Sequence, residues 1–258
     1  NEKKIVIKDD YRLKYLWEKK IAKKLKSRMI VFDDFDNSNH FADLIINPKT
    51  KFIEHDKSIV NSVEGKKTTF LLGPKYSLVE KIKKNPKFKK FTVIVNFGGS
   101  KKTNYIKNIL HSISKSNENI DFIFILSPIF KLKLKVKRKK NIKFINDSFD
   151  LQNIYSKSHL FLGAAGTSVY EVSAQKIPGI FFKISDNQET SYESLEKMGQ
   201  YFFLNKKYLQ KKYSSEIFRL IKGIKNNYKN IKFFTNNPII NIDDKGVSRI
   251  AKNILKIK

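Results

Sequence analysis

The chain has 258 residues, of which 40% are hydrophobic, which suits one large domain or two ordinary ones. It has no cysteine, which excludes disulfides, thiolate catalysis and cysteine-ligated metal, and it has no apolar run as long as a membrane span. The net charge of +29 suggests an anionic partner, but lysine supplies nearly all of it and arginine, the better residue for recognising phosphates and bases, is scarce. We therefore expect no specific nucleic-acid partner. We interpret the lysines as a solvated surface that could touch an anionic membrane.

The amino-terminal third alternates short apolar runs with one helical stretch. The spacing over 12–26 predicts a helix with one apolar face, and the segment 81–87, charged and containing a proline, is typical of a linker. The apolar runs that predict strands are 5–7, 29–32, 42–46 and 69–72.

The remainder alternates strands and helices more regularly. The expected strands are 91–95, 120–126, 142–145, 159–162 and 179–182. The expected helices are 103–115, 151–156, 167–175, 190–199, 214–229 and 244–257. Such alternation predicts a doubly wound parallel sheet. The lysine-rich stretch 131–140 fits an exposed edge strand or a basic loop.

The segment after strand 159–162 is the strongest local signal. Small residues, including Gly163 and Gly166, lead into a helix that begins near Thr167 and Ser168. Small residues let a ligand approach the backbone, and the N–H groups and positive end of the helix attract phosphate. Thr167 and Ser168 can cap the helix or donate hydroxyls, and Glu171 could accept the two hydroxyls of a ribose. The alternative is an ordinary strand–helix turn with a capping threonine.

Two further turns follow predicted strands. Gly98-Gly99-Ser100 comes after strand 91–95, and Asn187-Gln188 follows strand 179–182. The carboxyl ends of parallel strands meet at one edge of the sheet, where ligands bind in such folds. We therefore expect both turns to lie near Gly166.

Several strings occur in an order that resembles one known enzyme family. They are FDD (32–34), HFADLIIN (40–47), LGPKYSL (72–78), GGS (98–100), GAAGTSVYE (163–171), DNQ (186–188) and KGVSRI (245–250). The ordered set is similar to the UDP-2,4-diacetamido-2,4,6-trideoxy-β-L-altropyranose hydrolases of pseudaminic acid synthesis (PseG), which are related in fold to the MurG glycosyltransferase. The resemblance covers nearly the whole chain.

The resemblance implies an α/β fold of the GT-B type, with two Rossmann-like domains facing a cleft. The partial amino-terminal domain would span 1–85, the UDP-binding domain 86–243 and a final helix 244–258. It implies a hydrolase that releases UDP from a UDP-sugar by water attack. From the residues themselves, no His-x-x-x-His or His/Asp cluster predicts a metal, we expect no cofactor, and the absence of cysteine is compatible with the cytoplasmic location that we expect.

The resemblance also implies roles for single residues. Gly166, Thr167 and Ser168 would hold the pyrophosphate, and Glu171 would bind the ribose. Further contacts to the nucleotide, the phosphates or the sugar would come from Gly98, Gly99, Ser100, Gly163, Asn187, Gln188 and Tyr76.

One departure concerns catalysis. The family opens with a Gly-x-Gly-His-x-x-Arg turn whose histidine activates the water, and this chain lacks it. A Rossmann-like domain takes about 100–200 residues, so the chain looks amino-truncated. The catalytic residue is therefore unknown, with Asp33 and Asp34 as the acid/base candidates, of which at most one would face the cleft. We expect His40 to be structural, and His159 to be a satisfied core histidine. His55 and His111 are expected at the surface.

Two other functions remain open. One is a GT-B glycosyltransferase that uses a UDP-sugar donor and a membrane-bound acceptor. The other is a basic nucleic-acid-binding protein, which would show steeply salt-dependent binding.

Overall fold

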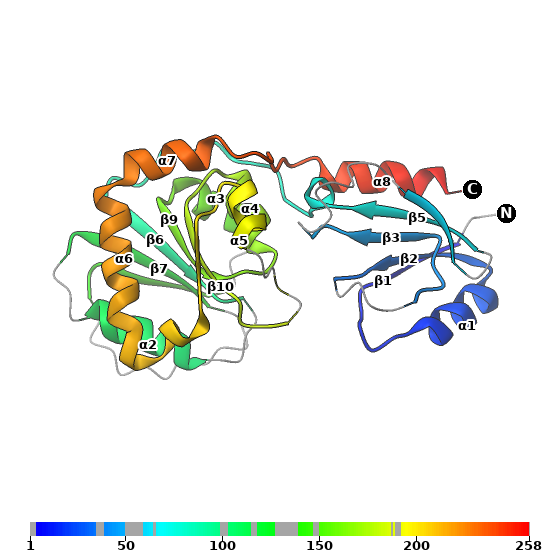
Figure 1. The fold of residues 1–258 in the computed structure, drawn as a ribbon, viewed down its shortest axis with the longest axis horizontal. Helices are drawn as coiled ribbons and strands as arrows, with labels where there is room; N and C mark the ends of the chain where they lie inside the picture. The colour runs from blue at the N-terminus through cyan, green and yellow to red at the C-terminus, as the bar shows by residue number, and fades with distance from the viewer. Residues whose placement is uncertain are drawn as a thin grey trace. The chain divides into compact units, whose positions relative to one another are not determined.

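The computed structural model describes residues 4–34, 39–49, 59–63, 66–98, 103–114, 118–126, 139–146, 150–186, 188 and 192–257. These residues form two compact units, each with its own sheet (Figure 1). The first unit is Asn1–Val79 together with Ile242–Lys258, and the second is Glu80–Asn241. Most of the stretch 131–140 and all of His55 lie outside the described residues.

The first unit is built on a five-stranded sheet in the order β1-β2-β3-β5-β4. Its strands are β1 (Lys4–Lys8), β2 (Ser27–Phe32), β3 (Leu44–Asn47), β4 (Ile59–Val63) and β5 (Lys66–Leu72). All the neighbours pair in parallel except β4, which is antiparallel to β5. Strand β4 is missing from the sequence-based expectation, because IVNSV is short and its apolar residues follow no clear period.

Helices pack on both faces of the first sheet because successive residues of β2 point to opposite faces. Met29 and Val31 pack with Ala22 and Trp17 of α1 (Tyr15–Leu25). Ile30, between them, packs in a second cluster that contains Ile250 of α8 (Gly246–Lys256). The carboxyl-terminal helix therefore belongs to the core of the first unit.

The second unit is a six-stranded sheet in the order β11-β10-β9-β6-β7-β8. The strands are β6 (Phe91–Asn96), β7 (Ile120–Leu126), β8 (Ile142–Asn146), β9 (Leu160–Ala164), β10 (Gly179–Phe182) and β11 (Phe202–Leu204). All pairings are parallel. The expected doubly wound parallel sheet is confirmed, and β11 adds an edge strand that was not expected.

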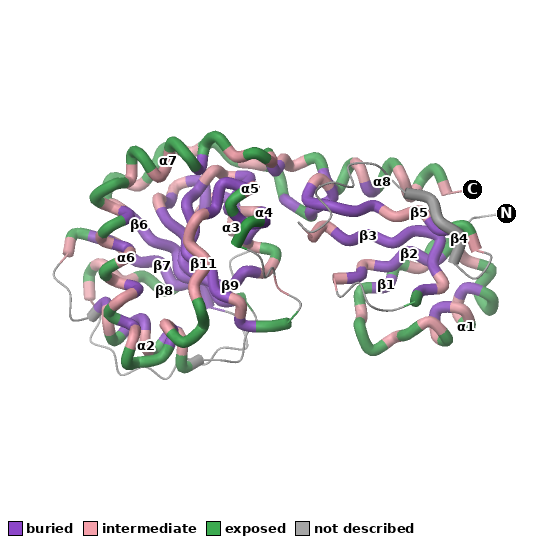
Figure 2. The backbone as a smooth tube through the Cα atoms, in the orientation of Figure 1, coloured by how far each residue is buried: buried purple, intermediate pink, exposed green. Residues whose placement is uncertain are grey.

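The helices of the second unit cover both faces of this sheet. They are α2 (Thr103–Ser114), α3 (Leu151–Lys157), α4 (Ser168–Ala174), α5 (Tyr192–Lys197), α6 (Ser214–Asn226) and α7 (Tyr228–Asn236). Leu162 and Phe182 face a core shared with α2 and α6, while Phe161 and Phe181 pack with Tyr155 of α3. Figure 2 shows the central strands buried along their length, as expected for strands covered on both faces.

The helix expected at 214–229 is divided in two. Asn227 leaves the helical conformation (φ −108°, ψ 22°), and α7 then continues to Asn236, beyond the predicted end. The break turns α7 away from α6 without a proline or glycine at the bend, so the sequence carries no strong signal for it.

Candidate functional site

The connections of the second sheet change direction between two neighbouring strands. From β6 the chain moves outward to β7 and β8, then returns to β9 on the other side of β6 and moves on to β10 and β11. In doubly wound sheets, ligands bind at the carboxyl ends of the strands that flank this switch point. The turns at Gly98 and Gly166 follow those two strands, so the structure brings these two predicted turns to one edge of the sheet.

Two glycines at this edge are explained by the backbone. Gly163 pairs with Asn96 across β9 and β6, and a Cβ on Gly163 would stand 1.8 Å from the Asn96 carbonyl oxygen. Gly98 has φ +62°, a conformation that favours glycine. Gly163 is thus required for strand packing, and its contact with a nucleotide stays a prediction. Gly99 and Ser100 lie outside the described residues.

Asn96 is a residue of this edge that the sequence reasoning missed. Its Oδ1 accepts a hydrogen bond from the Gly98 N–H at 2.8 Å, and its Nδ2 donates to the Tyr155 hydroxyl at 3.1 Å. Burial raises the pKa of Tyr155 well above its usual range, so the hydroxyl stays neutral. The asparagine therefore fixes the turn that follows β6. An Asn two residues before a glycine at a strand end is a recognisable signal for such a turn.

The turn from β9 into α4 presents unused backbone donors. Thr167 is the N-cap residue of α4, and its side chain makes no capping hydrogen bond, so the capping role considered for it is not taken. The N–H groups of Gly166, Thr167 and Ser168 have no acceptor among the described residues. Consecutive backbone donors that have no protein acceptor are suited to an anion such as phosphate.

Gln188 reaches this turn from the carboxyl end of β10. Its Oε1 accepts from the N–H of Ile184 at 2.8 Å and of Ser185 at 3.3 Å. A Cβ placed on Gly166 would stand 3.9 Å from the Gln188 Nε2, so the amide nitrogen lies beside the free donors. Asn187, the neighbouring residue that was expected to contact the ligand together with Gln188, lies outside the described residues.

Glu171 lies one turn into α4, and in the described residues its carboxylate has neither a hydrogen-bond donor nor a cation partner. Burial, and then repulsion by Glu80, raise its pKa to about 7. A partly buried carboxylate without a protein partner is costly, and such groups are typical of binding sites. Its position is compatible with the ribose contact predicted for it.

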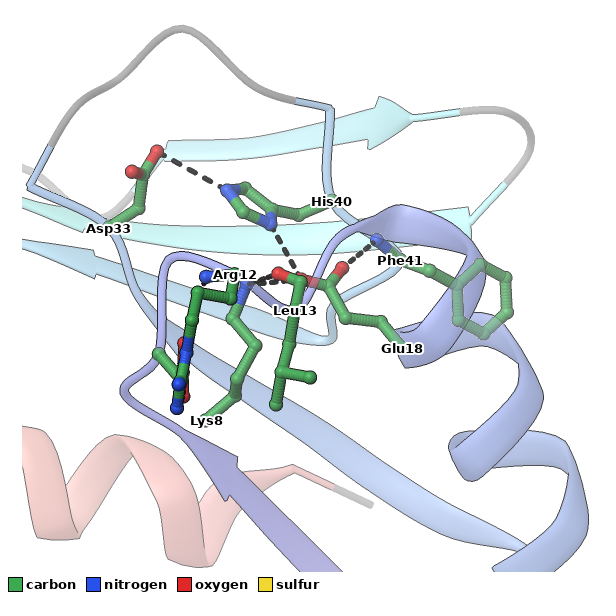
Figure 3. A network of polar contacts seen from close by, with 8 residues as sticks. Lys8, Arg12, Leu13, Glu18, Asp33, His40 and Phe41 are labelled. Carbon is green, nitrogen blue, oxygen red and sulfur yellow. Dashed lines mark hydrogen bonds and ion pairs between the residues drawn. The ribbon is translucent and has the colours of Figure 1, made fainter.

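The first unit holds a buried charged cluster at the carboxyl ends of β1 and β2 (Figure 3). His40 contacts Glu18 through Nδ1 at 2.8 Å and Asp33 through Nε2 at 3.3 Å. The Lys8 Nζ lies 2.5 Å from Glu18, which also accepts from the Phe41 N–H at 2.7 Å. Burial alone would lower the pKa of His40, but the hydrogen bonds to Asp33 and Glu18 outweigh it and raise the pKa to about 9.

This cluster fixes the surroundings of the two acid/base candidates. Asp33 is 7% exposed and is engaged by His40, whereas Asp34 accepts from the Tyr11 hydroxyl at 2.5 Å. The two side chains have different partners, as expected for neighbours on an extended segment. A catalytic role for either stays a prediction, while both ring nitrogens of His40 are used in packing the unit together.

Comparisons with known proteins identify the architecture. No protein-family model and no curated protein sequence matches the chain. Among solved structures, the chain is similar to the spinosyn rhamnosyltransferase SpnG (TM-score 0.62, 8% identity, 96% of this chain and 72% of that one). It is also similar to HepE from Anabaena in complex with UDP-glucose (TM-score 0.61, 11% identity, 97% and 78%). A third similar structure is a putative UDP-N-acetylglucosamine 2-epimerase from Listeria monocytogenes (TM-score 0.58, 11% identity, 97% of this chain and 73% of that one).

The chain has a GT-B-like fold. This confirms the expected fold class. The comparisons do not single out the PseG hydrolases, and at these identities the likeness concerns the fold and not the reaction.

The KGVSRI string (245–250) of this GT-B-like chain is explained by the packing of α8 in the first unit. A Cβ on Gly246 would stand 2.0 Å from the Ser77 carbonyl oxygen, so glycine lets α8 approach the short helix η2 (Pro74–Tyr76). Arg249 donates to Asp243 at 2.7 and 2.6 Å and to the Lys75 carbonyl at 3.0 Å. Tyr76, expected in a loop near the sugar, is 5% exposed and packs in the same core; its contact with a sugar stays a prediction.

Two other histidines lie among the described residues. His159 accepts from the Thr92 N–H at 3.1 Å and stacks on Phe91 at 5.1 Å, and His111 is exposed on α2. No group of three His, Asp or Glu side chains that could hold a metal ion occurs among the described residues. None of the helices described has the length and apolar character that crossing a membrane requires.

Proposed function

We propose that the chain is a GT-B glycosyltransferase that binds the UDP moiety of a UDP-sugar at the carboxyl edge of β6, β9 and β10. The observation that carries this proposal is the switch point between β6 and β9, with free backbone donors and an unpartnered carboxylate at the adjoining turn. Support comes from solved structures of the same fold, one bound to UDP-glucose and another to thymidine diphosphate.

Each group at this edge has a role in the proposal. The N–H groups of Gly166, Thr167 and Ser168 hold the pyrophosphate and stabilise the negative charge that develops on departing UDP. Glu171 accepts the ribose hydroxyls, and the Gln188 amide donates to a phosphate or sugar oxygen. Gly98 lets the nucleotide approach the β6 turn.

His40 does not supply a base for either sugar transfer or hydrolysis. An imidazolium with a pKa of about 9 is protonated at neutral pH, and both of its nitrogens face carboxylates. It is therefore unsuited to accept a proton from water. Sugar transfer is favoured over hydrolysis by the solved structures that are named as a rhamnosyltransferase and as a glycosyltransferase.

Hydrolysis of a UDP-linked 2,4-diacetamido-2,4,6-trideoxy sugar is the second candidate, supported by the ordered strings that run from FDD (32–34) to KGVSRI (245–250). The two candidates differ in what they need besides the donor. A hydrolase releases UDP in water alone, whereas a transferase releases it only when an acceptor is added.

The first experiment is calorimetric titration with UDP, followed by UDP release from a panel of UDP-sugars with and without lipid-linked acceptors. We expect UDP to bind, and release to require an acceptor. Release without acceptor would favour the hydrolase, and absence of UDP binding would refute both candidates.

A further inference from the structure

Helix α7 packs across the amino-terminal edge of the second sheet, opposite the candidate nucleotide site. The Tyr228 ring lies 5.3 Å from Phe91, the first residue of β6, and 5.6 Å from His159, which precedes β9. At the other end Thr235 is buried, and the Ile240 N–H donates to the Lys197 carbonyl at 2.7 Å. Both ends of the helix are therefore fixed to the unit.

The outer surface of α7 carries two large apolar side chains among exposed polar ones, where solvent would favour polar residues. Phe233 and Phe234 are 63% and 56% exposed, their rings meet edge to face at 5.6 Å, and Ile239 just beyond the helix is 80% exposed. Figure 2 shows the helix as mostly exposed. Large apolar side chains gathered on one face mark a surface for a partner or a membrane.

Positive charge adjoins this apolar group, and α7 contains no acidic residue. Lys229 is exposed and lies four residues before Phe233, so the two side chains share a face. Lys232, at the flank, donates to the Lys176 carbonyl, and Lys87 donates to the Ser158 carbonyl at 2.6 Å. None of Lys87, Lys176 and Lys232 has a carboxylate partner in the described chain.

The surroundings of Lys232 and Lys87 disfavour the charged form of each side chain. Burial, followed by repulsion from Lys87 and Lys176, lowers the pKa of Lys232 to about 8, and burial lowers the pKa of Lys87 to about 8. An anion placed beside Lys232 would offset the repulsion that it experiences from Lys87 and Lys176. Lipid phosphates supply such anions next to an apolar layer, which a soluble anion does not.

We propose that the surface formed by Phe233, Phe234 and Ile239 with Lys229, Lys232, Lys176 and Lys87 docks onto an anionic lipid bilayer. The phenylalanines enter the boundary between headgroups and acyl chains, and the lysines contact lipid phosphates. Because α7 lies at the amino-terminal edge of the sheet, docking leaves the carboxyl edge open. The inference is independent of which nucleotide, if any, that edge binds.

The experiment is co-sedimentation of the full chain with phosphatidylcholine vesicles, with and without phosphatidylglycerol. The test variant is Phe233→Ser with Phe234→Ser. Its matched control is Leu16→Ser with Leu255→Ser, which removes two apolar side chains that are 78% and 84% exposed on the first unit. We expect the test variant to lose about tenfold or more in affinity for the anionic vesicles, and the control to bind as the wild type does.

A charge pair separates local contact from general attraction of a basic protein. Lys229→Glu changes the charge on the α7 surface, and Lys107→Glu makes the same change at an exposed site on α2. We expect only Lys229→Glu to weaken binding to anionic vesicles, by about fivefold or more. Equal losses in the two charge variants, or in the two apolar variants, would overturn the proposal.

Three further measurements keep the result unambiguous. Phe233→Trp should give a blue-shifted emission on anionic vesicles, read against the wild type, whose only tryptophan is Trp17 in the first unit. Circular dichroism checks that the variants are folded, and light scattering checks the mass. If the wild type is a dimer that Phe233→Ser dissociates, the surface is a contact between copies of the chain and the lipid proposal fails.

Discussion

A carboxylate that is partly buried without a donor or cation holds its proton to an unusually high pH, and Glu171 is in this position. We expect Glu171→Ala to weaken UDP binding about tenfold or more, because hydrogen bonds to a charged group contribute roughly 1.5–3 kcal/mol. Pyrophosphate lacks the ribose, so its affinity should be unchanged. Calorimetric titration with both ligands measures the difference, and equal losses would contradict the ribose role.

The pH dependence of UDP binding gives a second measurement on Glu171. Its carboxylate form accepts two hydroxyls, and its pKa is about 7 in the free protein. UDP affinity should therefore rise as pH increases from 6 to 8. Glu171→Gln cannot titrate and serves as the control, since its profile contains only the ionisation of UDP itself. If wild type and Glu171→Gln have the same profile, Glu171 does not contact the nucleotide.

The stabilisation that His40 gives to the first unit is lost as pH rises, whereas that of an ordinary paired carboxylate is lost as pH falls. Its pKa is about 9 in the folded chain against about 6.5 when unfolded, so the folded state binds the extra proton between these values. The free energy of unfolding should therefore fall as pH rises from 6.5 through 9, by on the order of 2 kcal/mol. Urea unfolding followed by Trp17 fluorescence measures it, and His40→Gln should remove the slope.

At the scale of elements, glycines show how closely segments far apart in the sequence approach. Gly246 begins α8 against the Ser77 carbonyl, whereas a Cβ on Gly223 of α6 would meet nothing within 4 Å. We expect Gly246→Ala to destabilise the first unit by about 1–3 kcal/mol, because overlap at 2.0 Å forces the helix to move.

The matched substitution in an open position should have the opposite sign. Gly223→Ala should stabilise the second unit by about 0.5–1 kcal/mol, because alanine loses less backbone entropy in a helix. Chemical unfolding followed by circular dichroism measures both variants. A Gly246→Ala protein as stable as the wild type would show that α8 does not depend on this contact.

At the scale of the whole molecule, the two units have separate cores, and the only tryptophan lies in the first. If UDP binds the second unit alone, UDP at 100 times its dissociation constant should stabilise that unit by about 2.7 kcal/mol. The circular dichroism transition should then move to higher denaturant while Trp17 fluorescence does not. Glu171→Ala should reduce the shift, and an equal shift in both signals would contradict binding by one unit.

Much of the fold of the second unit could be predicted from local pattern. Strands such as 91–95 and 120–126 are apolar except for Thr92 and Asp121 because helices cover both of their faces, and such runs are visible without knowing their neighbours. The edge that carries Gly98 and Gly166 follows from parallel pairing alone. Strands β4 and β11 and the division at Asn227 were not expected from the sequence. Both strands are short, and no proline or glycine marks the division between the helices.

The sequence by itself determined the alternating α/β order and the turns where a ligand could meet the backbone, because periodicity and glycine placement are local properties. Only the tertiary structure decided that α8 closes the first unit, that Asn96 contacts the Tyr155 hydroxyl, and that Glu18 faces His40 from 22 positions away. Helical spacing over 12–26 does not distinguish Glu18 from its exposed polar neighbours. Its burial and the pKa of His40 depend on side chains that the chain brings together only on folding.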